Sequence, residues 1–128
     1  MKSLQRILYV EDEPDIQTIA RIALETVGGF TVEICGSGAE AIECVDRFAP
    51  DLILLDVMMP DMDGPATLAA LRSHSGAADI PVVFITANVQ TPEVEAYRAL
   101  GAAGVIAKPF DPMKLAAMIR EIWTRTHG

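Results

Sequence analysis

Four apolar segments of the chain are each followed by polar side chains of kinds that can bind a cation or an anion. The residues in question are Glu11, Asp12, Asp56, Thr86 and Lys108. Because ligands of open α/β sheets bind outside the carboxyl ends of parallel strands, side chains at those ends converge on one crevice. Each residue taken alone also suits a turn, a helix start, a strand or a solvated surface, but those explanations do not account for the shared position. The pattern therefore predicts a single site.

Three carboxylates and one amine decide what such a site can do. Two carboxylates at close range repel each other by about 4 kcal/mol at an effective dielectric constant of about 20, so Glu11, Asp12 and Asp56 together require a cation. Oxygen ligands without a nearby His or Cys favour a hard, water-retaining ion such as Mg²⁺. Lys108 adds a positive charge, and the Thr86 hydroxyl and backbone amides can donate hydrogen bonds, which describes a pocket for an anionic phosphoryl group. One carboxylate can then act as a nucleophile.

The elements that would position these groups alternate between strand and helix along the whole chain. We expect strands at residues 7–10, 30–35, 52–55, 82–85 and 105–107. Strict alternation of this kind favours a parallel sheet between layers of helices. The segment 52–55 is apolar throughout, as a central strand covered on both faces requires, whereas 30–35 alternates like a half-exposed edge strand.

Proline and glycine mark the helix ends. The first helix has Pro14 in its first turn and stops at Gly28-Gly29. Caps followed by proline are expected to start the fourth helix at Thr91-Pro92 and the fifth at Asp111-Pro112. The expected buried stripes are Ile16, Ala20, Ala23, Leu24 and Val27 in the first helix, Ala41, Val45 and Phe48 in the second, and Leu115, Met118, Ile119 and Ile122 in the fifth.

Composition fits one domain over residues 1–128, because 51% hydrophobic residues can fill a core of that size. The formal net charge of −8 disfavours direct binding to nucleic acid. No leader-like segment opens the chain and no apolar stretch approaches the roughly 18 residues of a membrane span, so we expect no membrane contact and a cytoplasmic location. Cys35 and Cys44 lack metal-ligand spacing, which favours reduced thiols.

Four motifs in a fixed order resemble the receiver domain of two-component response regulators, over essentially the whole chain. They are Val-Glu-Asp-Glu-Pro at 10–14, Leu-Leu-Asp-Val-Met-Met-Pro-Asp-Met-Asp-Gly at 54–64, Ile-Thr-Ala at 85–87 and Lys-Pro-Phe at 108–110. The resemblance implies a flavodoxin-like, doubly wound α/β fold whose five parallel strands have the order 2-1-3-4-5, with five helices. It also implies a Mg²⁺-dependent phosphoacceptor.

Carried over by position, the resemblance gives each site residue a role. Asp56 would accept the phosphoryl group. Asp56 and Asp12 would bind Mg²⁺ directly, with the backbone carbonyl of Met58, and Glu11 would act mainly through water. Lys108 would hold the phosphoryl group, Thr86 would turn inward to it, and Ala87 would leave room for that movement. A cis peptide bond between Lys108 and Pro109 is also implied.

The resemblance further implies a signalling partner on each side of the reaction. The donor would be a phosphohistidine on a sensor histidine kinase or a histidine phosphotransfer protein, and the receiver would catalyse only its own phosphorylation and dephosphorylation. The face built from the fourth helix, fifth strand and fifth helix would present the result to a downstream protein effector. Val105 stands where the family usually has an aromatic residue, so we expect switching by loop and fourth-helix repositioning alone.

Other readings of the same residues remain open. A phosphohydrolase of the haloacid dehalogenase type needs a second acid two residues after its aspartate, and that position here is Met58. A phosphate-independent interaction module could share the fold, because fold alone does not establish function. If the chain is complete, it leaves no residues for an output module; otherwise it is the receiver of a larger regulator or of a hybrid kinase.

Overall fold

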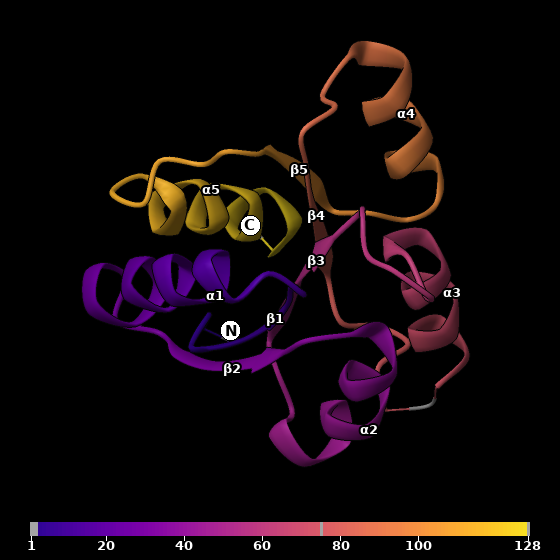
Figure 1. Cartoon of the computed structure of the whole chain (residues 1–128), viewed down its shortest axis with the longest axis horizontal. Coiled ribbons are helices and arrows are strands. Elements are labelled where there is room, and N and C mark those ends of the chain that lie inside the picture. Colours follow the sequence, from indigo (N-terminus) through magenta and orange to yellow (C-terminus); the bar gives the residue numbers. More distant parts are fainter. Residues whose placement is uncertain (1–2, 75, 128) are drawn as a thin grey trace.

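A five-stranded parallel sheet forms the centre of the computed structural model, which describes residues 3–74 and 76–127. The strand order is β2-β1-β3-β4-β5, as expected (Figure 1). The strands are β1 (Arg6–Val10), β2 (Thr31–Cys35), β3 (Leu52–Asp56), β4 (Val82–Thr86) and β5 (Gly104–Ala107). Their positions agree with the sequence-based expectation to within a residue at each end, and the expected edge strand is β2.

Helices cover both faces of this sheet. They are α1 (Pro14–Arg21) with its π-helical continuation η1 (Ile22–Val27), α2 (Gly38–Phe48), α3 (Gly64–Ser73), α4 (Thr91–Ala99) and α5 (Leu115–His127). Figure 1 shows α1 and α5 on one face and α2, α3 and α4 on the other. Within the described residues, no helix combines the length and apolar character needed to cross a bilayer.

Alternation along the strands divides the core into two layers. Ile7 and Tyr9 of β1 pack toward α1, η1 and α5, whereas Leu8 and Val10 pack toward α2 and α3. Every residue of β3 is buried, which confirms that this strand is central and covered on both faces. The site residues at its end therefore rest on a rigid support.

The first helix differs from the expectation near its end. The amide of Gly28 donates to the carbonyl of Ala23 at 3.1 Å, five residues back rather than four. This wider turn rotates the last residues around the helix axis, and Val27, expected to be buried, is 40% exposed. The other four residues of the expected stripe are buried or half-buried.

The helices α4 and α5 also begin differently from the sequence-based prediction. Gln90, not Thr91, is the N-cap of α4, so its proline takes the second helical position. The carboxylate of Asp111 accepts a hydrogen bond from the amide of Met113 at 2.9 Å, and this local turn delays α5 until Leu115.

The prediction of the buried residues of α5 is also partly wrong. Leu115, Ile119 and Ile122 are buried as expected, but Met118 is 38% exposed. Trp123 lies on the buried side in its place, because a helical period of 3.6 residues carries the stripe from Ile119 toward that residue. The stripe expected for α2 is buried in full.

Candidate functional site

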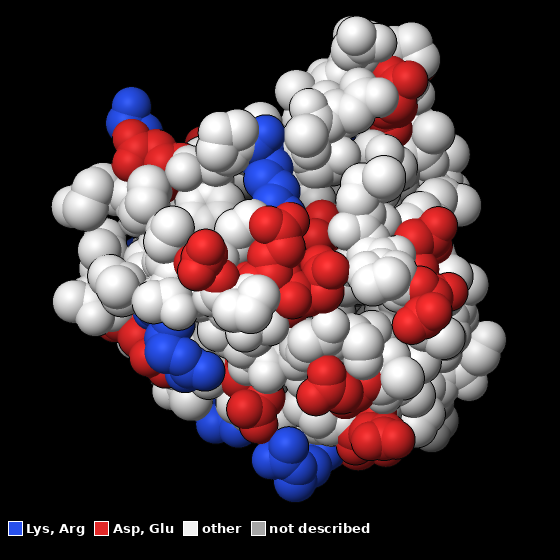
Figure 2. Space-filling view, in the orientation of Figure 1, with Lys and Arg blue, Asp and Glu red and all other residues white. Residues whose placement is uncertain are grey.

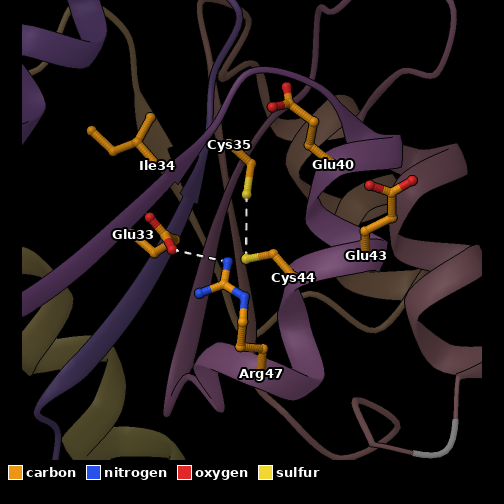
Figure 3. Close-up of a pocket in the computed structure, with 7 residues that line it drawn as sticks. All are labelled: Glu33, Ile34, Cys35, Glu40, Glu43, Cys44 and Arg47. Carbon is orange, nitrogen blue, oxygen red and sulfur yellow. Dashed lines mark hydrogen bonds and ion pairs between the residues drawn. The ribbon is translucent and has the colours of Figure 1, made fainter.

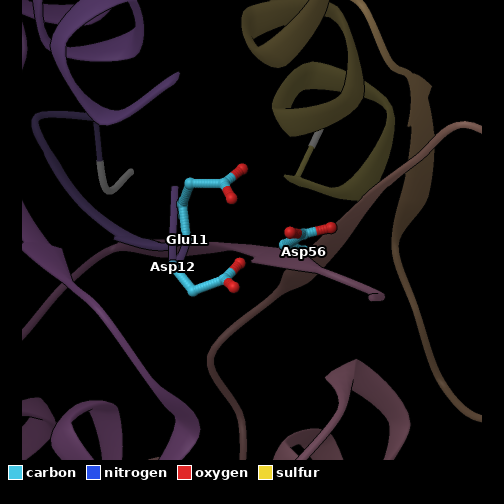
Figure 4. Close-up of side chains that lie close together, drawn as sticks. All are labelled: Glu11, Asp12 and Asp56. Atoms are coloured by element: carbon cyan, nitrogen blue, oxygen red, sulfur yellow. The ribbon is translucent and has the colours of Figure 1, made fainter. Parts of the chain in front are cut away.

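The carboxyl ends of β1 and β3 bring three carboxylates together. Glu11 and Asp12 directly follow β1, and Asp56 is the last residue of β3. One oxygen from each carboxylate lies within 4.8 Å of the others, and Figure 4 shows the three side chains gathered at this point. Figure 2 shows acidic side chains clustered at the centre of this face beside a basic one. The predicted convergence of the acids is confirmed.

Lys108, which follows β5, reaches into this cluster. Its Nζ lies 3.0 Å from Glu11 Oε1 and 3.2 Å from Asp56 Oδ2. A third carboxylate oxygen, Glu13 Oε1, lies 3.9 Å away. The peptide bond between Lys108 and Pro109 is cis, as the resemblance implied. Lys108 therefore links the two strand ends that carry Glu11 and Asp56.

Glu11 is fully buried, and both of its carboxylate oxygens are occupied. Oε1 accepts a hydrogen bond from the Tyr9 hydroxyl at 3.0 Å as well as from Lys108, and Oε2 accepts one from the Glu13 amide at 3.2 Å. Burial opposes ionisation, but the hydrogen bonds from Lys108 and Glu13 outweigh it and lower the pKa of Glu11. The side chain thus holds its charge and positions the lysine.

Asp56 ionises less readily than Glu11, although both contact the same lysine. Its Oδ1 accepts a hydrogen bond from the Met58 amide at 3.2 Å, and its Oδ2 faces Lys108. Burial, together with the charge on Glu11, raises the pKa of Asp56 to about 6 despite the opposing effect of Lys108. The lysine itself is also desolvated, but Glu11 and Asp56 more than compensate and raise its pKa.

Asp12 offers the clearest indication of a missing positive charge. Its Oδ1 is buried and has no hydrogen-bond partner among the residues that the structure describes. A buried carboxylate oxygen without a donor is costly, and Asp12 also contributes one oxygen to the group within 4.8 Å. An all-oxygen donor set of this charge suits a hard divalent cation such as Mg²⁺. The residues present therefore fit the metal that the sequence predicted.

The remaining predicted site residues lie at the rim or on the next strand. Thr86 ends β4 and is buried, but its Oγ1 accepts a hydrogen bond from the Asn88 amide at 3.1 Å. Ala87 is exposed, and the side chain of Met58 points to solvent while its amide bonds to Asp56. The hydroxyl of Thr86 is thus engaged locally in this structure.

Tyr9 is a member of the site that the sequence analysis missed. It lies two residues before Glu11, and side chains two apart along a strand point to the same face. That spacing could have suggested the contact between the phenol and the carboxylate. A buried Tyr usually finds a hydrogen-bond partner for its hydroxyl, which strengthens the signal.

Comparison with known proteins places this geometry in a family. The family model described as "Response regulator receiver domain" matches residues 7–120. Among curated relatives, the "DNA-binding response regulator MtrA" of Mycolicibacterium smegmatis is 38% identical over 116 residues, covering 91% of this chain and 49% of the relative. The "Response regulator Rre1" of Synechocystis is 34% identical, covering 93% of this chain and 52% of the relative. This chain thus spans about half the length of these relatives.

Solved structures show the same relationship. The chemotaxis protein CheY4 of Vibrio cholerae superposes with a TM-score of 0.85 at 28% identity, covering 94% of this chain and 99% of that one. The N-terminal domain of a response regulator receiver protein from Methanoculleus marisnigri gives a TM-score of 0.76 at 36% identity, covering 93% and 96%. From the family model, the relatives and the fold together, the chain belongs to the response regulator receiver domain family.

Proposed function

We propose that residues 1–128 form one receiver domain in which Asp56 accepts a phosphoryl group from a phosphohistidine. The observation that carries this proposal is the position of Asp56 Oδ2, 3.2 Å from Lys108 Nζ and beside the carboxylates of Glu11 and Asp12. A phosphoryl group on Asp56 would lie next to the positively charged amine of Lys108. The fixed amine, together with carboxylates whose charge a bound cation would offset, would favour in-line phosphoryl transfer mainly by position and charge.

The other two carboxylates are less suited to the nucleophilic role. Glu11 accepts three hydrogen bonds, from Tyr9, Lys108 and the Glu13 amide, whereas Asp56 accepts two. The unpartnered Oδ1 of Asp12 is better suited to a cation. Asp56, at the end of a central strand and bonded to Lys108, is left as the acceptor.

A cation would be held by Asp12 and Asp56 with the backbone carbonyl of Met58, and Glu11 would contribute through water. Mg²⁺ in that position would supply the positive charge that offsets the carboxylates and the incoming phosphoryl oxygens. Lys108 neutralises a further phosphoryl oxygen. We infer that the chain catalyses only its own phosphorylation and dephosphorylation.

The switch that we propose begins at Thr86. A phosphoryl group brings about −2 of charge. The Thr86 oxygen accepts a hydrogen bond from the Asn88 amide, so the hydroxyl keeps its own proton and would donate it to the phosphoryl group by turning inward, which would draw the loop after β4 with it. Asn88 in turn accepts a hydrogen bond from the Gln90 amide at the start of α4, at 3.3 Å. Small Ala87 leaves room for this movement, which would reposition α4 and the face it forms with β5 and α5.

Val105 on β5 is half-buried and has no ring that could move with Thr86. The conformational change therefore has to pass through the loop that follows β4 and through helix α4, without a moving side chain on β5. A coupling of about 1 to 3 kcal/mol between phosphorylation and binding of a downstream protein effector is sufficient for signalling.

The donor protein would contact the surface around the acids. An apolar hollow of about 290 Å³ is lined by Ile16, Ile19, Lys108, Pro109, Phe110 and Pro112. Because Lys108 belongs both to this hollow and to the acidic site, we propose that a protein presenting a phosphohistidine to Asp56 also contacts the hollow. We propose a sensor histidine kinase or a histidine phosphotransfer protein as that partner, acting in the cytoplasm and without direct contact of this chain to nucleic acid or membrane.

Intact mass spectrometry tests the proposal directly. Wild type incubated with Mg²⁺ and acetyl phosphate should gain about 80 Da, the mass of one phosphoryl group, whereas Asp56→Asn and a chelated sample should gain nothing. No gain in any sample would favour a phosphate-independent interaction module. Continuous release of phosphate from many substrates would favour a phosphohydrolase instead.

A further inference from the structure

The chain's two cysteines, nine positions apart, meet at the boundary between β2 and α2. Cys35 is the last residue of β2 and Cys44 lies within α2. Their Sγ atoms are 3.5 Å apart, and both are free thiols (Figure 3). Neither residue belongs to the acidic site. The sequence analysis predicted reduced thiols but gave no reason to expect contact between them.

A pocket of about 390 Å³ gives small solutes access to this pair. Besides Ile34 and the two cysteines, it is lined by Glu33, Glu40, Glu43 and Arg47 (Figure 3). The one guanidinium, on Arg47, already pairs with Glu33 at 3.2 Å. Three carboxylates against one cation repel anionic oxidants such as glutathione disulfide but not a small neutral peroxide.

We propose that Cys35 and Cys44 are a modification site, at which a hydroperoxide converts the two thiols into an intramolecular disulfide that joins β2 to α2. Forming the bond requires the sulfurs to approach from 3.5 Å to about 2.05 Å. This is a movement of about 1.5 Å, which is small for side chains on two already packed elements. The inference does not depend on phosphorylation of Asp56.

The order of the two steps follows from the surroundings of each sulfur. Burial, reinforced by Cys44 and by the carboxylates of Glu40 and Glu33, raises the pKa of Cys35. Cys44 is the more accessible residue, at 8% exposure against 4%. Cys44 therefore reacts with the peroxide first and Cys35 closes the bond.

In the first step the Cys44 sulfur attacks the O–O bond, an S–O bond forms, and the leaving hydroxide takes the thiol proton as water. In the second step the Cys35 sulfur attacks the Cys44 sulfur, the S–S bond forms, and the sulfenic oxygen leaves with the Cys35 proton and its own as a second water. Two thiols lose two electrons in total, and the hydroperoxide accepts them. For hydrogen peroxide the products are one disulfide and two waters.

The backbone connects this pair to the acidic site. The carbonyl of Cys35 accepts a hydrogen bond from the Glu11 amide at 2.9 Å. A disulfide would fix the end of β2 against α2 and so restrain the strand end that carries Glu11. Cys35 is thus joined by one backbone hydrogen bond to Glu11, the residue whose side chain positions Lys108.

The test is intact mass of the full chain after exposure to hydrogen peroxide, followed by alkylation under denaturing conditions. Wild type should lose about 2 Da, take up no alkylating reagent, and recover both thiols on treatment with dithiothreitol. Cys35→Ser and Cys44→Ser are the matched controls, and neither should show the 2 Da loss. Two alkylatable thiols after exposure, predominant sulfinic acid or predominant cross-linked dimers would overturn the proposal, as would the same 2 Da loss in either control.

Discussion

At the scale of single residues, Glu11 and Asp56 behave differently although each contacts Lys108. Glu11 has three hydrogen-bond donors and a lowered pKa, whereas Asp56 has two and a raised pKa. Burial disfavours ionisation of both, but the donors to Glu11 outweigh it, whereas at Asp56 the charge on Glu11 adds to the effect of burial. Of these two carboxylates, Asp56 is the one whose charge is less well compensated before a cation binds.

Replacing Asp56 by Asn should stabilise the metal-free protein above neutral pH. Because the pKa of Asp56 is raised from 3.8 to about 6 in the folded state, the folded protein binds more protons than the unfolded one between these values. The stability from this group is present at low pH and is lost as pH rises through about 6. Urea unfolding with a chelator should therefore show Asp56→Asn more stable than wild type by about 1 to 3 kcal/mol at pH 8, with near equality at pH 4.

Asp61→Asn is the matched control for that comparison. Asp61 is exposed and has a φ of 67°, a conformation that Asn also tolerates. Its stability should follow that of wild type at both pH values. Equal stabilities of Asp56→Asn and wild type at pH 8 would show that burial does not disfavour the Asp56 charge.

Tyr9→Phe tests whether the phenol supports Glu11. The change keeps the buried ring but removes the donor to Glu11 Oε1 at 3.0 Å. Hydrogen bonds to charged groups contribute about 1.5 to 3 kcal/mol. The substitution should therefore decrease the free energy of unfolding by an amount within that range or somewhat below it. Tyr97→Phe, whose ring meets Phe84 edge-on at 5.1 Å between centroids, should change it much less. An unchanged free energy of unfolding in Tyr9→Phe would mean that Lys108 and Glu13 suffice to hold the Glu11 carboxylate.

At the scale of elements, the molecule contrasts a rigid centre with a loosely held α4. Every residue of β3 and β4 is buried, and α3 buries Gly64, Thr67, Leu68 and Leu71. In α4 no residue is buried. The proposed switch from Thr86 through Asn88 thus leads from the rigid sheet to the helix that costs least to move.

Amide hydrogen exchange should separate these elements. We expect the amides of α4 to exchange at least about tenfold faster than those of α3, because few buried contacts oppose local opening of α4. Beryllofluoride, a phosphoryl mimic, should change protection in α4 and in the loop after β4 more than in α3. The proposed switching route would be wrong if protection in α4 matched that in α3 and stayed the same with the mimic.

The sequence predicted the elements and the site better than their details, for a physical reason. The spacing of hydrophobic residues and the prolines and glycines at the ends of elements are local signals. They therefore identified five strands, the central β3 and the convergence of Asp56 with Lys108. The π-helical turn of η1 depends on tertiary packing, where a Cβ on Gly28 would approach the Ala116 Cβ to 2.9 Å. The contact of Cys35 with Cys44 likewise depends on how α2 docks on β2.

At the scale of the whole molecule, metal binding and stability are linked. The formal net charge is −8, and three of the carboxylates are concentrated at one end of the sheet. A ligand that binds only the folded state stabilises it by about 2.7 kcal/mol at a concentration of 100 Kd. Mg²⁺ should therefore raise the melting temperature of this protein.

Asp12→Asn should lose most of that effect, because it removes the unpartnered carboxylate charge. Thermal unfolding with and without Mg²⁺ at constant ionic strength measures the difference, and Asp61→Asn should keep the full shift. An undiminished shift in Asp12→Asn would place the cation elsewhere on the molecule.

The central claim is that the phosphoryl group is attached to Asp56, and locating it by chemical trapping tests that claim most directly. Borohydride reduces an aspartyl phosphate to homoserine, and peptide mass spectrometry then identifies the modified residue. After incubation with Mg²⁺ and acetyl phosphate, homoserine should appear at residue 56 alone, and at a lower yield in Lys108→Ala. Modification at Asp12 or another acid, or none in protein shown to be folded, would contradict the account.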